Sequence, residues 1–145
     1  MARTARRAIA ATEGVTYGAA QVREWSASFD ATTIEHILAS SPAWVFEAEG
    51  VAVAFATLVA RADGDAELDL LYVDPELAGC GIGRALVEAA EHEATGRGHE
   101  ALWADASVPA QAMLQRCGFT FVRANPKSLR GAAFDNAWLV KALRG

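Results

Sequence analysis

Residues 72–84 read YVDPELAGCGIGR, with glycines at alternate positions where a strand pattern gives way to a helix pattern. The strand pattern stops at Asp74-Pro75, and apolar residues at helical spacing resume beyond Gly83. The first amides of a helix have no partner within it, and glycine lets a ligand approach them without a Cβ in the way. The stretch therefore predicts a turn that binds a phosphate at a helix N-terminus.

Two other glycine-rich turns fit this stretch less well. A dinucleotide-binding turn has the spacing GxGxxG and opens a βαβ unit, whereas this chain has GxGxG after a run of antiparallel strands. A P-loop ends in Gly-Lys followed by Ser or Thr, an ending that these residues do not have. A plain tight turn, with glycines needed only for its geometry, stays open. Arg84 is poorly placed for the helix dipole but well placed beside a bound phosphate.

The chain on either side of this turn indicates a mixed α/β fold in one domain, 1–145. The expected order is an antiparallel meander followed by a parallel βαβ unit, with tight turns at Glu49-Gly50 and Arg130-Gly131. Hydrophobic spacing predicts helices over 3–11, 17–28, 32–39, 81–95 and 108–116, and strands over 43–48, 51–61, 67–73, 100–106, 119–124 and 134–143.

Composition excludes several classes of partner. The formal net charge is -5 and no basic stripe is visible, so we expect no nucleic-acid partner. No long apolar run predicts a membrane span. Cys80 and Cys117 do not form a CxxC pair, and the three histidines lack metal-ligand spacing, so we expect a soluble protein of the reducing cytoplasm without a metal.

The residues Val73-Asp74-Pro75 followed by Gly81-Ile82-Gly83, together with Cys117-Gly118-Phe119, resemble the GNAT (GCN5-related) superfamily of N-acetyltransferases. The resemblance covers about the last two thirds of the chain. It implies a central mixed sheet whose two parallel strands splay apart. It also implies transfer of the acetyl group of acetyl-CoA to an amine by direct attack in a ternary complex, with no metal.

The resemblance implies a cofactor site along one strand and the glycine-rich turn. Ala78 stands where the family has Arg or Gln, so one side chain expected at the pyrophosphate is missing while its backbone amide remains. Cys80 is expected to supply only its amide rather than a nucleophile. The residues expected to contact the cofactor are Leu71, Tyr72, Val73, Ala78, Gly79, Cys80, Gly81, Ile82, Gly83, Arg84 and Ser107.

Catalysis by such a protein needs a base for the amine. Glu67 or Asp69 is expected to fill this role, because both lie on the strand that leads to the acetyl group. Strand alternation puts both on one face with Leu71 and Val73 unless a bulge intervenes; ordinary solvent-facing carboxylates are the alternative. The tyrosine that often serves as general acid falls at Leu114, so the thiolate is expected to leave unassisted or to take a proton from water.

The acceptor is expected to be a small-molecule amine, because residues 17–25 and 129–136 look like a small-molecule branch of the family. Tyr17 and Trp25 share a helical face and are candidates for the acceptor pocket, with packing onto the sheet as the alternative. Ala78 and Leu114 favour a second interpretation, a degenerate sensor or assembly module that binds CoA or acetyl-CoA. The family's first strand has no counterpart before Arg3, so the chain is expected to be short at its N-terminus. A homodimer stays open.

Overall fold

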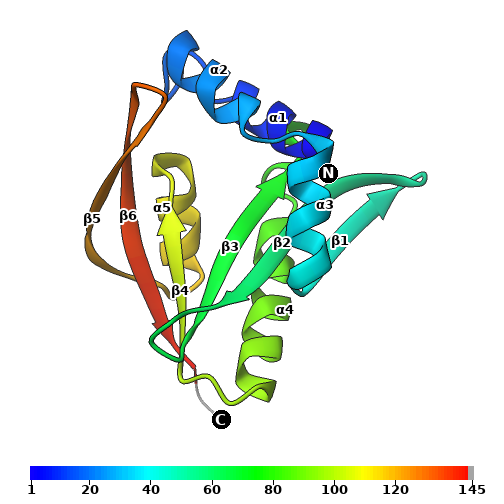
Figure 1. Ribbon diagram of the computed structural model, residues 1–145. Helices are drawn as coiled ribbons and strands as arrows, with labels where there is room; N and C mark the ends of the chain where they lie inside the picture. Colours follow the sequence, from blue (N-terminus) through cyan, green and yellow to red (C-terminus); the bar gives the residue numbers. More distant parts are fainter. Residues whose placement is uncertain (144–145) are drawn as a thin grey trace.

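The computed structural model describes residues 1–143, which form a mixed sheet with helices on both faces (Figure 1). A membrane-spanning helix is absent from this part of the chain, because none of its helices is both long and apolar enough. The elements are α1 (Ala2–Ala10), α2 (Ala19–Ala27), α3 (Ala31–Ser40), β1 (Ala43–Ala48), β2 (Val51–Ala60), β3 (Ala66–Val73), the 3₁₀ helix η1 (Pro75–Leu77), α4 (Ile82–Gly96), β4 (Ala101–Ala106), α5 (Val108–Arg116), β5 (Thr120–Leu129) and β6 (Ala132–Ala142).

The strands form one six-stranded sheet in the order β1-β2-β3-β4-β6-β5. Its only parallel pair among residues 1–143 is β3 with β4, and every other neighbour is antiparallel. The parallel pairing covers just 66–68 against 102–104, after which the two strands diverge (Figure 1). The predicted antiparallel meander, βαβ unit and splayed parallel pair are therefore confirmed.

Two hydrophobic clusters lie on opposite faces of the sheet. One face carries α4 and α5, whose buried residues include Leu86, Val87 and Leu114. The other carries α1, α2 and α3, which bury Ile9, Val22 and Ile34 against strand residues such as Phe55 and Phe134. The second set of helices covers one end of the sheet (Figure 1).

The last hairpin is longer than the sequence predicts. The turn at Arg130-Gly131 is confirmed, with φ of 49° and 84° at its two residues. However, β5 runs to Leu129 rather than ending at Ala124, and β6 starts at Ala132 rather than Phe134. Pro126 caused the error, because proline usually interrupts a strand. Here β5 is the outer strand of the sheet, so the missing N–H of Pro126 removes no ladder hydrogen bond.

Candidate functional site

The glycine-rich turn forms between β3 and α4 as predicted. The Asp74 carboxylate accepts a hydrogen bond from the Glu76 N–H at 3.0 Å and begins η1. Gly79 and Gly81 follow with φ of 81° and 83°, a conformation that residues with a side chain rarely adopt. No atom lies within 4 Å of the position where a Cβ would stand on either glycine, so the space beside them is open.

The amides of this turn divide into two groups. Those of Ala78 and Cys80 donate to the carbonyls of Pro75 and Leu77, both at 3.3 Å, and so help to build the turn itself. The others have no acceptor among residues 1–143, and they are the amides of Gly79, Gly81, Ile82, Gly83 and Arg84. Unpaired donors at a helix N-terminus suit a diphosphate, because the helix dipole adds positive charge there.

Two cavities, of about 370 and 470 Å³, adjoin the β3–β4 gap. The one of about 470 Å³ begins at the glycine-rich turn and reaches Leu71 and Ser107, and we call it the turn cavity. Arg84 lies at its rim, where its guanidinium donates to the Arg116 carbonyl at 3.1 Å. The other, of about 370 Å³, lies over the strand face below α2, and we call it the acidic cavity.

The backbone of β3 turns two amides into the gap. The Leu70 N–H donates to Thr57 Oγ1 at 3.1 Å and the Asp74 N–H donates to the Val53 carbonyl at 2.8 Å, both toward β2. Because amides alternate along a strand, those of Leu71 and Val73 point the other way, toward β4. An extended ligand in the gap could therefore hydrogen-bond to β3 as a neighbouring strand would. The Val73 amide lies nearer the glycine-rich turn, and the Leu71 amide lies farther from it.

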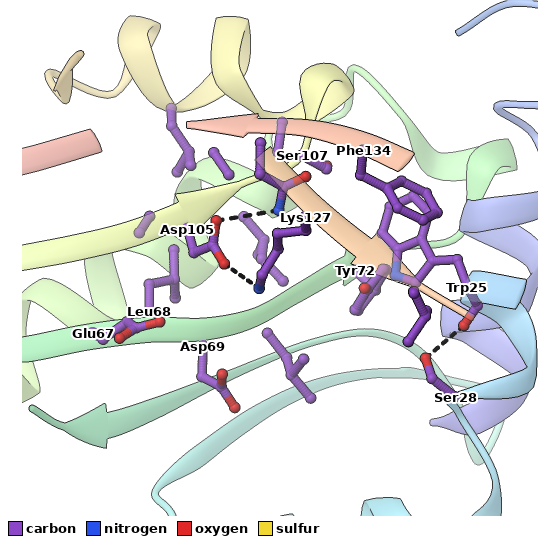
Figure 2. Close-up of a pocket in the computed structure, with 18 of the residues that line it drawn as sticks. Trp25, Ser28, Glu67, Leu68, Asp69, Tyr72, Asp105, Ser107, Lys127 and Phe134 are labelled. Atoms are coloured by element: carbon purple, nitrogen blue, oxygen red, sulfur yellow. Dashed lines mark hydrogen bonds and ion pairs between the residues drawn. The ribbon is translucent and has the colours of Figure 1, made fainter. Parts of the chain in front are cut away.

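A β-bulge changes the expected facing of the two candidate bases. Thr57 pairs with Leu70 and Leu58 pairs with Leu68, which leaves Asp69 as the extra residue. Leu71 and Val73 therefore pack on the same face as Leu68, toward α4 and α5. Glu67 and Asp69 do not share that face, because the bulge, which was the stated exception to the expected alternation, is present and resets it. Instead, both carboxylates line the acidic cavity on the opposite face (Figure 2).

The two cavities meet at the gap. Trp25, Leu71, Tyr72, Ser107 and Ala110 line both of them. Aromatic rings close one end of the acidic cavity, and Glu67, Asp69 and Asp105 lie toward the other (Figure 2). A ligand held along the glycine-rich turn and the gap would thus present its inner end to a second ligand in the acidic cavity.

Partial desolvation raises the pKa of three groups here, of which Glu67 and Tyr72 are half-buried and Asp69 is the most exposed. Desolvation raises the pKa of Glu67, and the charge of Asp69 adds to this, while Arg61, 3.5 Å from the Glu67 carboxylate, opposes it. Desolvation also raises the pKa of Asp69, against the opposing charge of Lys127. The pKa of the half-buried Tyr72 phenol is raised by desolvation as well, and the nearby Trp25 indole partly offsets this.

Asp105 was missed by sequence reasoning. It lies on β4 between the buried Ala104 and Ala106, and its carboxylate accepts hydrogen bonds from Asn125 Nδ2 at 3.0 Å, from Asn136 Nδ2 at 3.2 Å and from Lys127 Nζ. The sequence did hold one indication of Asp105 as a site residue, since it is a carboxylate between two alanines at the end of a predicted strand. Its partners could not be found that way, because they come from other strands.

The expectation that Tyr17 and Trp25 share a helical face is wrong, because α2 begins at Ala19 and Tyr17 precedes it. Trp25 lines both cavities, as an acceptor-pocket residue would. Tyr17 is not among the residues that line either cavity; it is 5% exposed and packs edge-on against Trp25 and Phe134. Its hydroxyl accepts a hydrogen bond at 3.2 Å from the Val108 N–H, at the first turn of α5. Tyr17 therefore links the segment before α2 to the start of α5, and its ring supports Trp25.

Leu114 is the residue that the resemblance predicts in place of a general acid. It is 2% exposed and lines the acidic cavity from α5, so an apolar side chain occupies this wall. Cys80 is exposed on the turn, and Cys117 is buried. Within residues 1–143 no group of three or more His, Cys, Asp or Glu side chains is placed to hold a metal ion.

An amide-lined turn that opens into a gap between diverging parallel strands has the shape and the donors to hold a diphosphate with a long extended arm. The chain matches the model of the Acetyltransferase (GNAT) family over residues 8–119, and it belongs to that family.

Individual relatives agree with this assignment. An N-acetyltransferase of Escherichia coli strain K12, YafP, described as uncharacterized, is 29% identical over 133 residues, covering 92% of this chain and 81% of that protein. A crystal structure of a GCN5-related N-acetyltransferase from Rhodopseudomonas palustris is 27% identical, with a TM-score of 0.87 over 98% of this chain and 87% of that one. The PaiA N-acetyltransferase of Thermoplasma acidophilum, solved with coenzyme A, shares the fold with a TM-score of 0.81 at 17% identity, over 97% and 89% of the two chains.

Proposed function

We propose that this protein is an N-acetyltransferase that uses acetyl-CoA to acetylate an amine of a small molecule, by direct attack in a ternary complex. The observation that carries the proposal is the continuous path from the unpaired amides at 79–84, along the inward amides of Val73 and Leu71, into the acidic cavity. The proteins it resembles include one solved with coenzyme A, which supports this choice of donor.

The residues present fit coenzyme A. The amides of Gly79, Gly81, Ile82, Gly83 and Arg84 would hold the diphosphate, and the open space beside Gly79 and Gly81 leaves room for it. The Val73 amide would pair with the pantetheine arm, and Ser107 would lie beside that arm. When bound, acetyl-CoA supplies a thioester whose carbonyl carbon accepts the amine.

The chain contributes an oxyanion donor and a base. The Leu71 amide points into the gap at its deeper end, where it would stabilise negative charge on the carbonyl oxygen. Asp69 is the better placed base, because its carboxylate has no ion-pair partner in the part of the chain that the structure describes, whereas Glu67 is paired with Arg61. A raised pKa suits a carboxylate that must take a proton from an ammonium group, directly or through water.

Turnover with a panel of amines tests the proposal. Acetyl-CoA is mixed with the protein and each amine, and the release of free thiol is followed, while calorimetry measures coenzyme A binding separately. Thiol release that depends on both protein and amine is the expected result. Coenzyme A binding without turnover across a broad panel would instead support a sensor or assembly module, the alternative that the apolar Leu114 favours. No binding of coenzyme A would reject both.

A further inference from the structure

Asp105 is arranged to hold one ammonium group at the acidic cavity. Its side chain is only 12% exposed. One carboxylate oxygen, Oδ1, accepts from the two neutral amides of Asn125 and Asn136, at 3.0 and 3.2 Å. The other oxygen, Oδ2, accepts from Lys127 Nζ. The two asparagines, on β5 and β6, orient the carboxylate without neutralising it, so its charge is left for a single cation.

Lys127 is a replaceable occupant of that position. Its side chain is 52% exposed and extends from the outer strand β5, and Asp105 is its one ion-pair partner among residues 1–143. A flexible side chain on an exposed strand loses rotamer freedom when it is held this way. It can swing into solvent when another cation arrives, so the ammonium of Lys127 marks where an ammonium of a ligand would bind (Figure 2).

Charge in the cavity favours a ligand with more than one positive group. Three carboxylates, Glu67, Asp69 and Asp105, line the cavity with one ammonium, that of Lys127. Arg61 offsets Glu67 but is shared with Asp63. Asp69 therefore remains to attract the amine that reacts, while Asp105 can hold a second one.

From these contacts we propose that the acceptor is a linear di- or polyamine, whose non-reacting ammonium takes the place of Lys127 on Asp105. This rests on the proposed function, because it needs the reacting amine to lie at the Leu71 amide. Asp105 is one residue beyond the last β3–β4 pair, Leu68 with Ala104, and Leu71 is further along the adjacent strand. From the strand rise and the spacing of paired strands, the two positions are at least roughly 6–8 Å apart, because the strands diverge beyond that pair, which suits two amines separated by four or more carbons.

Three acceptors of matched length test the proposal at saturating acetyl-CoA: 1,4-diaminobutane, 1-aminobutane and 4-aminobutanoate. The diamine is expected to exceed the monoamine in kcat/KM by roughly 10- to 100-fold, as one charge-assisted hydrogen bond would give. The amino acid is expected to be the poorest of the three, because its carboxylate meets Asp105. Equal kcat/KM for the diamine and the monoamine, or a preference for 4-aminobutanoate, overturns the proposal and leaves the transferase intact.

Two substitutions move the diamine-to-monoamine ratio in opposite directions. Asp105→Asn keeps the shape but removes the charge, so the ratio should fall toward one. Lys127→Met removes the internal competitor, so the KM for the diamine should drop and the ratio should rise. Because Lys127 is largely exposed, this second variant is informative even if Asp105→Asn fails to fold. A ratio that neither substitution changes overturns the proposal. No thiol release with the three amines, while another amine of the broad panel is acetylated, also overturns the proposal and leaves the transferase intact; no thiol release across the whole panel, with coenzyme A still bound, rejects the transferase itself.

Discussion

Arg7 of α1 is paired with Asp74, the residue that begins the glycine-rich turn. Arg7 Nη2 donates to Asp74 Oδ1 at 3.2 Å, while Nε lies 2.8 Å from Oδ2 as a charge contact that is not an aligned hydrogen bond. The same carboxylate accepts from the Glu76 N–H. A residue near the N-terminus and the turn that would hold the diphosphate are therefore joined directly.

Arg7→Ala is expected to lower stability modestly. The pair is partly exposed, so its loss should cost about 0.5–1 kcal/mol. The pKa of Asp74 is held low, first by the Glu76 amide and then by Arg7. The stabilisation is thus present near neutral pH and is lost as the pH falls through that lowered pKa. Thermal unfolding at neutral and acid pH measures this, with Arg6→Ala on the same helix as the control. An equal loss for both variants would contradict the assignment.

Gly83→Asp is expected to separate cofactor binding from folding. A Cβ on Gly83 would lie 3.7 Å from Met113 Cε and 3.8 Å from Val73 Cγ2, both ordinary contacts. A carboxylate in the first helical turn is favourable for the helix but repels a diphosphate. We expect coenzyme A affinity to fall at least about tenfold with no drop in Tm.

Gly83→Ala is the matched control for this loss, because it keeps the amide and adds no charge. Calorimetry should find its coenzyme A affinity close to that of the unaltered protein. Gly81→Val is a poorer probe, since φ at Gly81 is 83° and the substitution would strain the turn itself. Unchanged affinity in Gly83→Asp would remove the diphosphate from this turn.

Asp69→Asn is expected to lower kcat/KM by about 10²- to 10⁴-fold, the usual contribution of a general base. The same change should raise Tm only slightly at neutral pH, because Asp69 is exposed and solvent screens its charge. Desolvation raises the pKa of Asp69 in the folded protein, so its contribution to stability is full below the unfolded pKa and is lost as pH rises through the folded one. The asparagine removes that loss, and the gain in Tm should therefore shrink at acid pH.

Asp63→Asn provides the comparison, because Asp63 lies in an exposed turn where the Asp65 amide lowers its pKa. It should lower neither kcat/KM nor the yield of folded protein. If Asp69→Asn retains full kcat/KM, the base is not Asp69, and Glu67→Gln becomes the next variant to measure.

The pH profile of kcat is expected to rise and then level off, with no falling limb up to about pH 9.5. A falling limb reports an acid that loses its proton, and Leu114 has none to lose. Burial raises the pKa of the Tyr72 phenol beyond this range. The departing thiol, with an ordinary pKa of about 8.5, leaves without help. A falling limb below pH 9 that disappears in Tyr72→Phe would instead make Tyr72 the acid.

The turn and the strands around it could be predicted because their signals are local. Glycine spacing, Pro75 and the change of hydrophobic period all lie within a few residues of one another. The bulge at Asp69 was not predictable in the same way, because it depends on how β3 pairs with β2 and on the hydroxyl of Thr57 in that neighbouring strand.

The cluster around Asp105 could not be predicted from the sequence for a related reason. Asn125 and Asn136 are 20 and 31 residues from Asp105, and they reach it only because β6 and β5 follow β4 in the sheet. The sequence pattern puts Tyr17 and Trp25 on one helical face, yet Tyr17 precedes α2 and only Trp25 lines the cavities. Both rings pack against Phe134, a residue from the far end of the chain.

Because β3 and β4 pair over only three residues, the rest of each strand has an unpaired edge in the middle of the sheet. Without a ligand, the main-chain groups of Leu71 and Val73 that point toward β4 have no partner strand on that side, as at the edge of a sheet. The halves on either side are then joined by this short pairing and by the hydrophobic clusters on the two faces of the sheet. A cofactor arm lying between them would act as a seventh, removable strand and bind the halves into one cooperative unit.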